Sequence, residues 1–395
     1  MAEAGREAWI TGIGIVSCLG EGAQANWQGL LERRANVDAT TFAPYIVHPL
    51  AAINLDLQIP KKGDQRQMEP WQRIGTYAAG LALDDARIKG NAELLARTDM
   101  IVAAGGGERD VAVDGAILTG LAKAADPQAF LNERLMSDLR PTLFLAQLSN
   151  LLAGNISIVH GVTGSSRTFM GEESCGVDAL RIALARIRSG DSELALVGGS
   201  QHAREDILLL YEFQRANLRD RFAPVWQRGP QGGFALGSMG AFLVIEAKSH
   251  AQARGAKPVA KLVTVLSDRA KRVPGARQAR LEEMWRGLMP SLQRGRAAVL
   301  SGATGAEPAT AEERAFLAAH PDCPVRATGS RIGHGLEPQF VMNVALAALA
   351  LRHGKLFPPD DAGGVERTTD VAPGQIVVTS VGVVRGEGMA LIEAI

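Results

Sequence analysis

Cysteine and histidine are two residue types in this chain that could act as nucleophiles, general bases or metal ligands. The 395 residues include three cysteines (Cys18, Cys175 and Cys323) and seven histidines. The cysteines show no CxxC spacing, and the histidines include no HExxH pair. We therefore predict no disulfide framework, no thiolate metal cluster, no bound metal and no other cofactor.

The elements that would position these residues follow an α/β pattern. Short apolar runs at residues 8–16, 100–104, 194–197, 240–245 and 376–380 are typical of buried strands. Helical periodicity is found at residues 71–87, 175–188 and 340–352. The second of these segments begins at Cys175 and repeats Val177, Leu180, Leu184 and Ile187. The alternation predicts helices that cover a mainly parallel sheet.

Composition narrows the class of protein. Forty-two basic residues balance forty-two acidic ones, which argues against a nucleic-acid binder that works by neutralising phosphates. Apolar residues make up 46% of the chain, enough for a large core in two domains or two fused halves. The first residues contain no long apolar segment, and no run of eighteen apolar residues occurs anywhere. We expect a cytoplasmic protein without membrane contact.

A division into two halves is predicted from the segment at residues 251–258, which follows one apolar strand and precedes another. It separates an N-terminal half, residues 1–250, from a C-terminal half, residues 251–395. Residues 267–280 carry a run of positive charge: Arg269, Lys271, Arg272, Arg277 and Arg280. We interpret this run as a solvated loop, with a docking site as the alternative.

Several motifs together resemble the β-ketoacyl-carrier-protein synthases, condensing enzymes of the thiolase superfamily. They are WITGIGIVSCLG at residues 9–20, EESCGVDAL at 172–180, RSGDSELALVGG at 188–199, GFALGSMG at 233–240 and TGSRIGH at 328–334. The resemblance covers nearly the whole chain. It implies a five-layer α-β-α-β-α fold, made of two similar halves, that normally dimerises.

The family's nucleophile is missing. Claisen condensation requires a cysteine thiolate, which these enzymes place at a strand-to-helix elbow where the helix amino terminus stabilises negative charge. The resemblance puts Glu173 at that position. Cys175 lies two residues further on, where a helix has turned by about 200°, so we expect a buried thiol that points away. Glu173 would either stabilise the helix end or fill the acyl pocket.

Three further family positions are altered. Two histidines of the family hydrogen-bond the thioester oxygen and the enolate. Ser301 replaces the first of these histidines, and His334 retains the second. A purely structural role for His334 is an equally good interpretation. Gly329 stands where a lysine is expected, and Val383 replaces a gating phenylalanine. Loss of one nucleophile already costs many orders of magnitude in rate. We therefore assign no catalytic residue and regard these positions as degenerate.

These substitutions predict an acyltransferase homologue of fatty-acid or polyketide biosynthesis that is inactive alone. It would resemble chain-length-factor subunits, pairing with an active ketosynthase or with itself and meeting an acyl carrier protein. One alternative is a malonyl-carrier-protein decarboxylase. Another is a thioester hydrolase in which Ser301, His334 and Glu173 form a triad. A surviving condensing activity and a scaffold role unrelated to lipids remain open, as does the product.

Overall fold

Two similar sets of strands, joined edge to edge, form the centre of the computed structural model, which describes residues 6–107, 109–139, 145, 147–293, 295–361 and 363–395. The first set has the spatial order β5-β4-β6-β8-β1, and the second has the order β11-β10-β12-β13-β9. Strand β1 pairs with β9 over three residues and links the two sets. The strands are β1 Ala8–Ser17, β4 Asp99–Ala103, β5 Ser166–Phe169, β6 Leu194–Gln201, β8 Met239–Ala247, β9 Ala260–Asp268, β10 Ala297–Ser301, β11 Val325–Ala327, β12 Gln375–Val381 and β13 Glu387–Glu393.

The two sets repeat one topology. In each, the first strand in the chain lies antiparallel to the fifth, and the fifth lies antiparallel to the fourth. The fourth runs parallel to the second, which in turn runs parallel to the third at the outer edge. The expectation of two similar halves is thus met by the strand order. The boundary expected between residues 250 and 251 lies inside α11, Lys248–Ala253, and stays a prediction.

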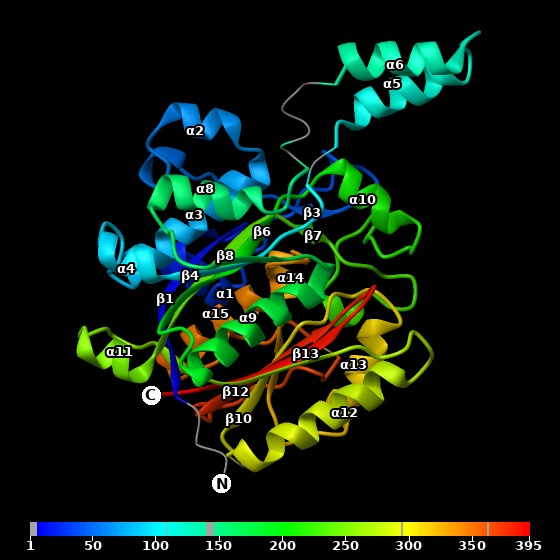
Figure 1. Cartoon of the computed structure of the whole chain (residues 1–395). Coiled ribbons are helices and arrows are strands. Elements are labelled where there is room, and N and C mark those ends of the chain that lie inside the picture. The colour runs from blue at the N-terminus through cyan, green and yellow to red at the C-terminus, as the bar shows by residue number, and fades with distance from the viewer. Residues whose placement is uncertain (1–5, 108, 140–144, 146, 294, 362) are drawn as a thin grey trace.

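Helices make the remaining layers (Figure 1). Helices α9 (Glu172–Ser189) and α15 (Gln339–Arg352) pack against strands of both sets and bury apolar side chains in one central cluster. Helices α3 (Pro70–Asp85) and α8 (Leu151–His160) share a second cluster with the outer face of the first set. Helices α12 (Ala276–Leu288) and α13 (Ala309–Ala318) cover the second set. The α-β-α-β-α layering is confirmed.

Periodicity located the long helices within a few residues of their ends. The segment expected from residue 175 begins earlier, at Glu172, because two acidic residues start the helix where its free N–H groups favour negative charge. Helix α3 begins one residue before its expected start, at a capping box formed by Glu69 and Gln72. Apolar spacing identifies the face that packs, whereas capping side chains decide where the helix begins.

One helical hairpin stands away from the layers. Helices α5 (Val111–Leu121) and α6 (Pro127–Ser137) pack on each other and extend from the body at the upper right of Figure 1. Among the described residues, no helix combines the length and the apolar character that a bilayer crossing requires. The remaining short elements are β2 Gly20–Glu21, α1 Gly22–Leu31, β3 Val47–His48, α2 Lys62–Gln67, α4 Ala92–Arg97, α10 Glu205–Glu212, β7 Leu236–Gly237, α11 Lys248–Ala253 and α14 Gly329–Ile332.

Candidate functional site

A sharp elbow between β5 and α9 begins the site. Gly171 adopts φ 139°, and the next residue, Glu172, adopts φ 49° in the left-handed region. A side chain in that region strains the backbone and persists only where surrounding contacts hold it. The elbow directs the first turn of α9 toward the carboxyl end of β12. Glu173, which the motif resemblance predicts to occupy the family's nucleophile position, follows at once.

Glu173 is buried and engaged on one oxygen. Its Oε1 lies 3.3 Å from Nε2 of His334 and accepts a 3.0 Å hydrogen bond from the backbone N–H of Val383. Burial by itself raises the pKa of Glu173, but the hydrogen bond and charge of His334 and the Val383 N–H outweigh it, and the pKa lies below its ordinary value. The other oxygen, Oε2, has no hydrogen-bond partner among the described residues.

His334 is also buried and is fixed by a backbone hydrogen bond and a ring contact. Its backbone N–H donates to the carbonyl of Ala235 at 2.8 Å, and its ring lies edge-on to Phe234 with centroids 5.2 Å apart. Only 3% of the residue is exposed. The ring nitrogen that a thioester oxygen would need is therefore occupied by Glu173. Of the five degenerate positions, three meet here: Glu173, His334 and Val383.

Cys175 does not replace the missing nucleophile. Its side chain packs in the central apolar cluster, and Sγ donates to the carbonyl of Glu172 at 3.0 Å. Burial, assisted by the charges of Glu337 and Glu172, raises the pKa of the Cys175 thiol well above its ordinary value. A thiol in this environment stays protonated and unreactive at neutral pH. Cys175 thus points away from the position of Glu173, as the two-residue offset along α9 predicts.

Ser301 is turned to a different partner. It ends β10 and is fully buried, with Oγ donating to Oε1 of Glu313 at 2.8 Å. The same hydroxyl accepts from the backbone N–H of Ala303 at 3.0 Å. A serine nucleophile must instead donate to its histidine. The arrangement of Ser301, His334 and Glu173 expected of a hydrolytic triad is not the one formed.

Gly329 leaves no room for the lysine that the family carries. A Cβ added to it would lie 2.7 Å from the carbonyl oxygen of Ala303 and 3.0 Å from Cγ1 of Val225. Arg228, a residue not singled out from the sequence, donates to the carbonyl oxygens of Thr304 and Gly329 at 2.6 and 3.4 Å. Burial lowers the pKa of Arg228 to about 9. The guanidinium of Arg228 therefore links the two segments in which the resemblance predicts the family's first histidine and its lysine.

Restoring that lysine should damage the fold. We expect Gly329→Lys to lower the free energy of unfolding by about 1–3 kcal/mol, the usual cost of overpacking a filled site. Gly63→Lys is the matched control, because a Cβ at Gly63 meets no atom within 4 Å. Urea unfolding of both variants measures the difference. Equal stability of the two would contradict the crowding at Gly329.

Glu337 is a second buried carboxyl that the sequence did not single out. It precedes α15, and its Oε2 accepts from Gln201 at 3.3 Å. Burial raises the pKa of Glu337 to about 7, and the negative charge of Glu173 adds to the effect. The signal available in the sequence was a single acidic residue within residues 332–341, whose other polar side chains are those of His334 and Gln339.

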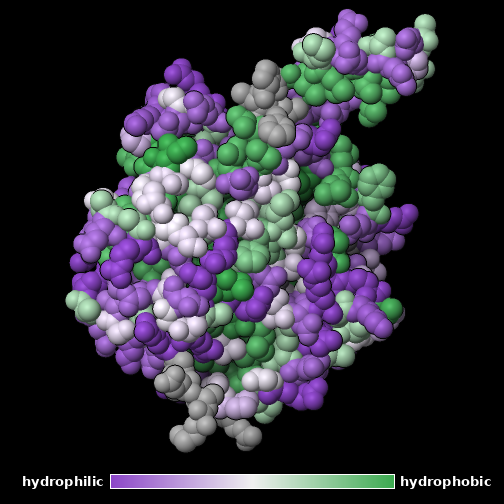
Figure 2. Space-filling view, viewed as in Figure 1, coloured by the Kyte–Doolittle hydropathy of each residue, from purple (hydrophilic) through white to green (hydrophobic). Residues whose placement is uncertain are grey.

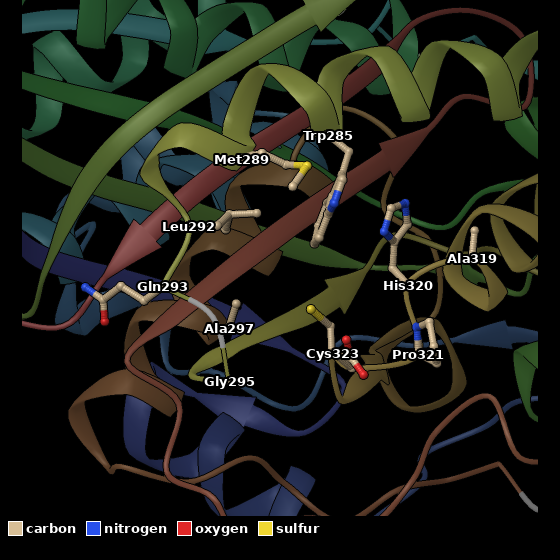
Figure 3. A pocket seen from close by; sticks show the side chains of 11 residues that line it. Trp285, Met289, Leu292, Gln293, Gly295, Ala297, Ala319, His320, Pro321 and Cys323 are labelled. Atoms are coloured by element: carbon tan, nitrogen blue, oxygen red, sulfur yellow. The ribbon is translucent and has the colours of Figure 1, made fainter.

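The cavity drawn in Figure 3 lies apart from this group of side chains. It has a volume of about 360 Å³ and is lined from α12, the start of β10 and the turn after α13, with Trp285, His320 and Cys323 around it. None of the five degenerate positions lines it. Within the described residues, no group of three or more histidine, cysteine, aspartate or glutamate side chains could hold a metal ion.

Comparison with known proteins agrees with the motifs. Residues 6–251 match the family described as "Beta-ketoacyl synthase, N-terminal domain". The 3-oxoacyl-[acyl-carrier-protein] synthase 2 of Vibrio harveyi is 27% identical over 270 residues, 65% of this chain and 62% of that protein. The enzyme of the same name from Rhizobium meliloti (strain 1021) is 26% identical over 280 residues, 65% and 63% of the two chains. The matched region thus spans less than two thirds of these relatives.

Solved structures match over the full length. The ishigamide ketosynthase/chain length factor superposes with a TM-score of 0.81 at 19% identity, covering 99% of this chain and 100% of that one. A β-ketoacyl synthase from Burkholderia phymatum STM815 gives the same TM-score at 17% identity and the same coverage. At this level of identity, the likeness shows the fold.

Proposed function

The chain belongs to the β-ketoacyl synthase family, and from that premise we propose that it is a catalytically silent subunit that pairs with an active ketosynthase in fatty-acid or polyketide assembly. One observation carries the proposal: the residue at the nucleophile position is a buried carboxylate that pairs with the retained histidine. A carboxylate so engaged cannot accept an acyl chain from a thioester as a thiolate does. The protein would act by shaping its partner's acyl tunnel across their interface.

The surface offers support for pairing. Strand β5 lies at the open end of the first strand set, so one of its edges has no neighbouring strand among the described residues. The hairpin of α5 and α6 exposes Leu118, Leu135 and Met136, and Figure 2 shows hydrophobic side chains along it. A pair of short helices gains most of its stability by packing an apolar face on another surface. A second ketosynthase-fold chain would cover this face.

Named complexes among the structural neighbours fit the same proposal. One match, with a TM-score of 0.76 and 17% identity, is titled as a type II PKS acyl-carrier protein in complex with its ketosynthase. The ishigamide structure is that of a ketosynthase/chain length factor. These names describe those proteins. For this chain we propose a ketosynthase as the partner and an acyl carrier protein as the carrier of the shared product.

The two alternative activities find less support. Decarboxylation of a malonyl thioester relies on the histidine pair, and here Ser301 is bound to Glu313 while His334 is bound to Glu173. Hydrolysis requires Ser301 to face His334, and its hydroxyl faces Glu313 instead. Among the described residues, no contact specifically favours either decarboxylation or hydrolysis.

Purification from the native cells tests the proposal. We expect the tagged chain to elute as a stable one-to-one complex with a ketosynthase that has the active-site cysteine, identified by native mass spectrometry. Leu118→Asp combined with Met136→Lys should release the partner, whereas Leu57→Asp, at a side chain exposed to a similar degree, should retain it. Recovery of a homodimer alone would count against the partner-subunit role.

A further inference from the structure

A second cavity lies between α13, β11 and the segment before β12, and it shares the turn after α13 with the cavity of Figure 3. Its volume is about 360 Å³. Two arginines line it, Arg314 and Arg367, and the side chains of Leu317, Val325 and Val365 give it apolar walls. Among the described residues, no aspartate or glutamate lines it. We name it the arginine cavity.

The two arginines donate to carbonyl oxygens rather than to carboxylates. Nη2 of Arg314 donates to the carbonyl of Trp226 at 2.7 Å, and Nη2 of Arg367 donates to the carbonyl of Pro321. Nε of Arg314 is buried and has no hydrogen-bond partner among the described residues. Each guanidinium carries five N–H donors, so both keep charge and donors that the described part of the chain leaves unused.

Arginines that line three further cavities all pair with a carboxylate. Because Arg272 and Arg277 are among them, the interpretation of residues 267–280 as a solvated loop does not hold for these two. Arg314 and Arg367 lack such a partner among the described residues. The pairs in the other cavities are Arg109 with Asp114, Arg204 with Asp206, Arg272 with Glu387, Arg277 with Glu312, and both Arg6 and Arg97 with Glu193.

The acidic neighbours of the two arginines in the chain are bound elsewhere. Glu313, beside Arg314, accepts from hydroxyl groups on β10 and β12. Glu366, beside Arg367, accepts from the indole N–H of Trp226 at 3.0 Å, and burial raises the pKa of Glu366 to about 7. Neither carboxyl lines the arginine cavity. The positive charge at the cavity is therefore open to an anionic ligand.

The guanidinium of Arg314 is already fixed in place. It lies over the ring of Trp226, 5.7 Å from the centroid, and also binds the carbonyl of that residue. A side chain fixed in this way loses little freedom when a ligand binds. The planar guanidinium offers paired N–H donors that match the two oxygens of a carboxylate. Apolar walls strengthen such a charge pair, because they lower the local dielectric constant.

We propose that the arginine cavity binds a small organic carboxylate with an apolar chain. The carboxylate contacts Arg314 and Arg367, and the chain packs against the apolar walls. The volume lies at the lower end of the range for small-molecule sites, about 300–1,000 Å³, which suits a short chain. None of the five degenerate positions lines this cavity, so the proposal does not depend on the partner-subunit role.

Calorimetric titration of the full-length protein with octanoate tests the site. We expect saturable one-to-one binding, and Arg314→Gln and Arg367→Gln should each raise the Kd by about tenfold, the usual effect of losing a hydrogen bond to a charged group. Arg367 is exposed, so its replacement leaves the core intact, whereas Arg314 also packs on Trp226. Arg66→Gln, at an exposed position of α2, is the control and should leave the Kd unchanged.

Two further probes separate the charge from the chain. Octanol keeps the chain without the carboxylate, and inorganic phosphate keeps negative charge without the chain. Each should bind at least about tenfold more weakly than octanoate. Cys323 lines the cavity and gives an independent signal. Octanoate should slow its alkylation by N-ethylmaleimide, while labelling of the buried Cys18 and Cys175 stays unchanged.

Three results would overturn the assignment. The first is an absence of octanoate binding, or a Kd for Arg367→Gln equal to that of the wild type. The second is octanol binding as tight as that of octanoate, which would exclude the arginines as the determinants. The third is phosphate binding as tight as that of octanoate, which would indicate a site for inorganic anions without a role for the apolar walls.

Discussion

Replacing Glu173 by alanine is expected to lower the free energy of unfolding by about 3–5 kcal/mol at pH 7, the cost of removing one partner from a buried ion pair. Alanine leaves the buried ring of His334 and the partly buried N–H of Val383 without their acceptor. Urea unfolding measures the loss. A change below about 1 kcal/mol would fit only a solvent-exposed contact and would contradict the burial of the pair.

Glu173→Gln is the matched variant, since its amide oxygen can still accept from Val383. We expect it to cost about 1 kcal/mol at pH 7. Because the pKa of Glu173 is lower in the folded protein than in the unfolded chain, its stabilising contribution is present at neutral pH and fades as the pH falls below its ordinary value of 4.5. The wild type and Glu173→Gln should therefore converge in stability on acidification, which unfolding at pH 7 and pH 4 would measure.

Replacing Glu337 by glutamine should act in the opposite direction and stabilise the protein at alkaline pH. A carboxyl whose pKa rises from 4.5 to about 7 on folding costs the native state about 3 kcal/mol once it is ionised. The native state binds more protons between these values, so stability falls as the pH rises through that window. Glutamine keeps the shape, and its side-chain oxygen can still accept from Gln201.

We expect Glu337→Gln to gain about 3 kcal/mol over the wild type at pH 8 and under about 1 kcal/mol at pH 5, measured by urea unfolding at both values. Glu93→Gln, at an exposed position of α4, is the control and should change little. Because the charge of Glu173 contributes to the raised pKa of Glu337, the gain should shrink in a Glu173→Gln background. An equal gain at pH 5 and pH 8 would exclude ionisation as the cause.

Together these carboxylates change what the elbow can do. In a condensing enzyme, the helix amino terminus stabilises a thiolate that then carries the acyl chain. Here the same helix end carries Glu173, whose Oε1 is already hydrogen-bonded to the N–H of Val383 and in contact with His334. The elbow remains strained at Glu172, whose carboxylate binds Arg385. The elbow geometry of a nucleophile site is retained, and under the proposed function packing and hydrogen bonding replace its chemistry.

The sequence by itself determined the family and the layered fold, and it predicts that the nucleophile is missing. These conclusions rest on local signals: apolar spacing defines α3, α9 and α15, and short motifs place Glu173, rather than a cysteine, at the elbow. The position of Cys175 also followed from the sequence, because two residues along any helix turn a side chain to another face. Such signals lie within a few residues of each other and survive without knowledge of the packing.

Only the tertiary structure decided which degenerate positions meet. Glu173 contacts His334, 161 positions away, and Val383, 210 positions away. The hydrolase alternative predicts that Ser301 joins them. Instead, Ser301 binds Glu313 on α13, a helix that covers the second strand set. The contacts of Arg228, Glu337 and Arg385 also join distant segments. Each contact joins segments distant in the chain, and their approach depends on how the two halves pack, which no local spacing encodes.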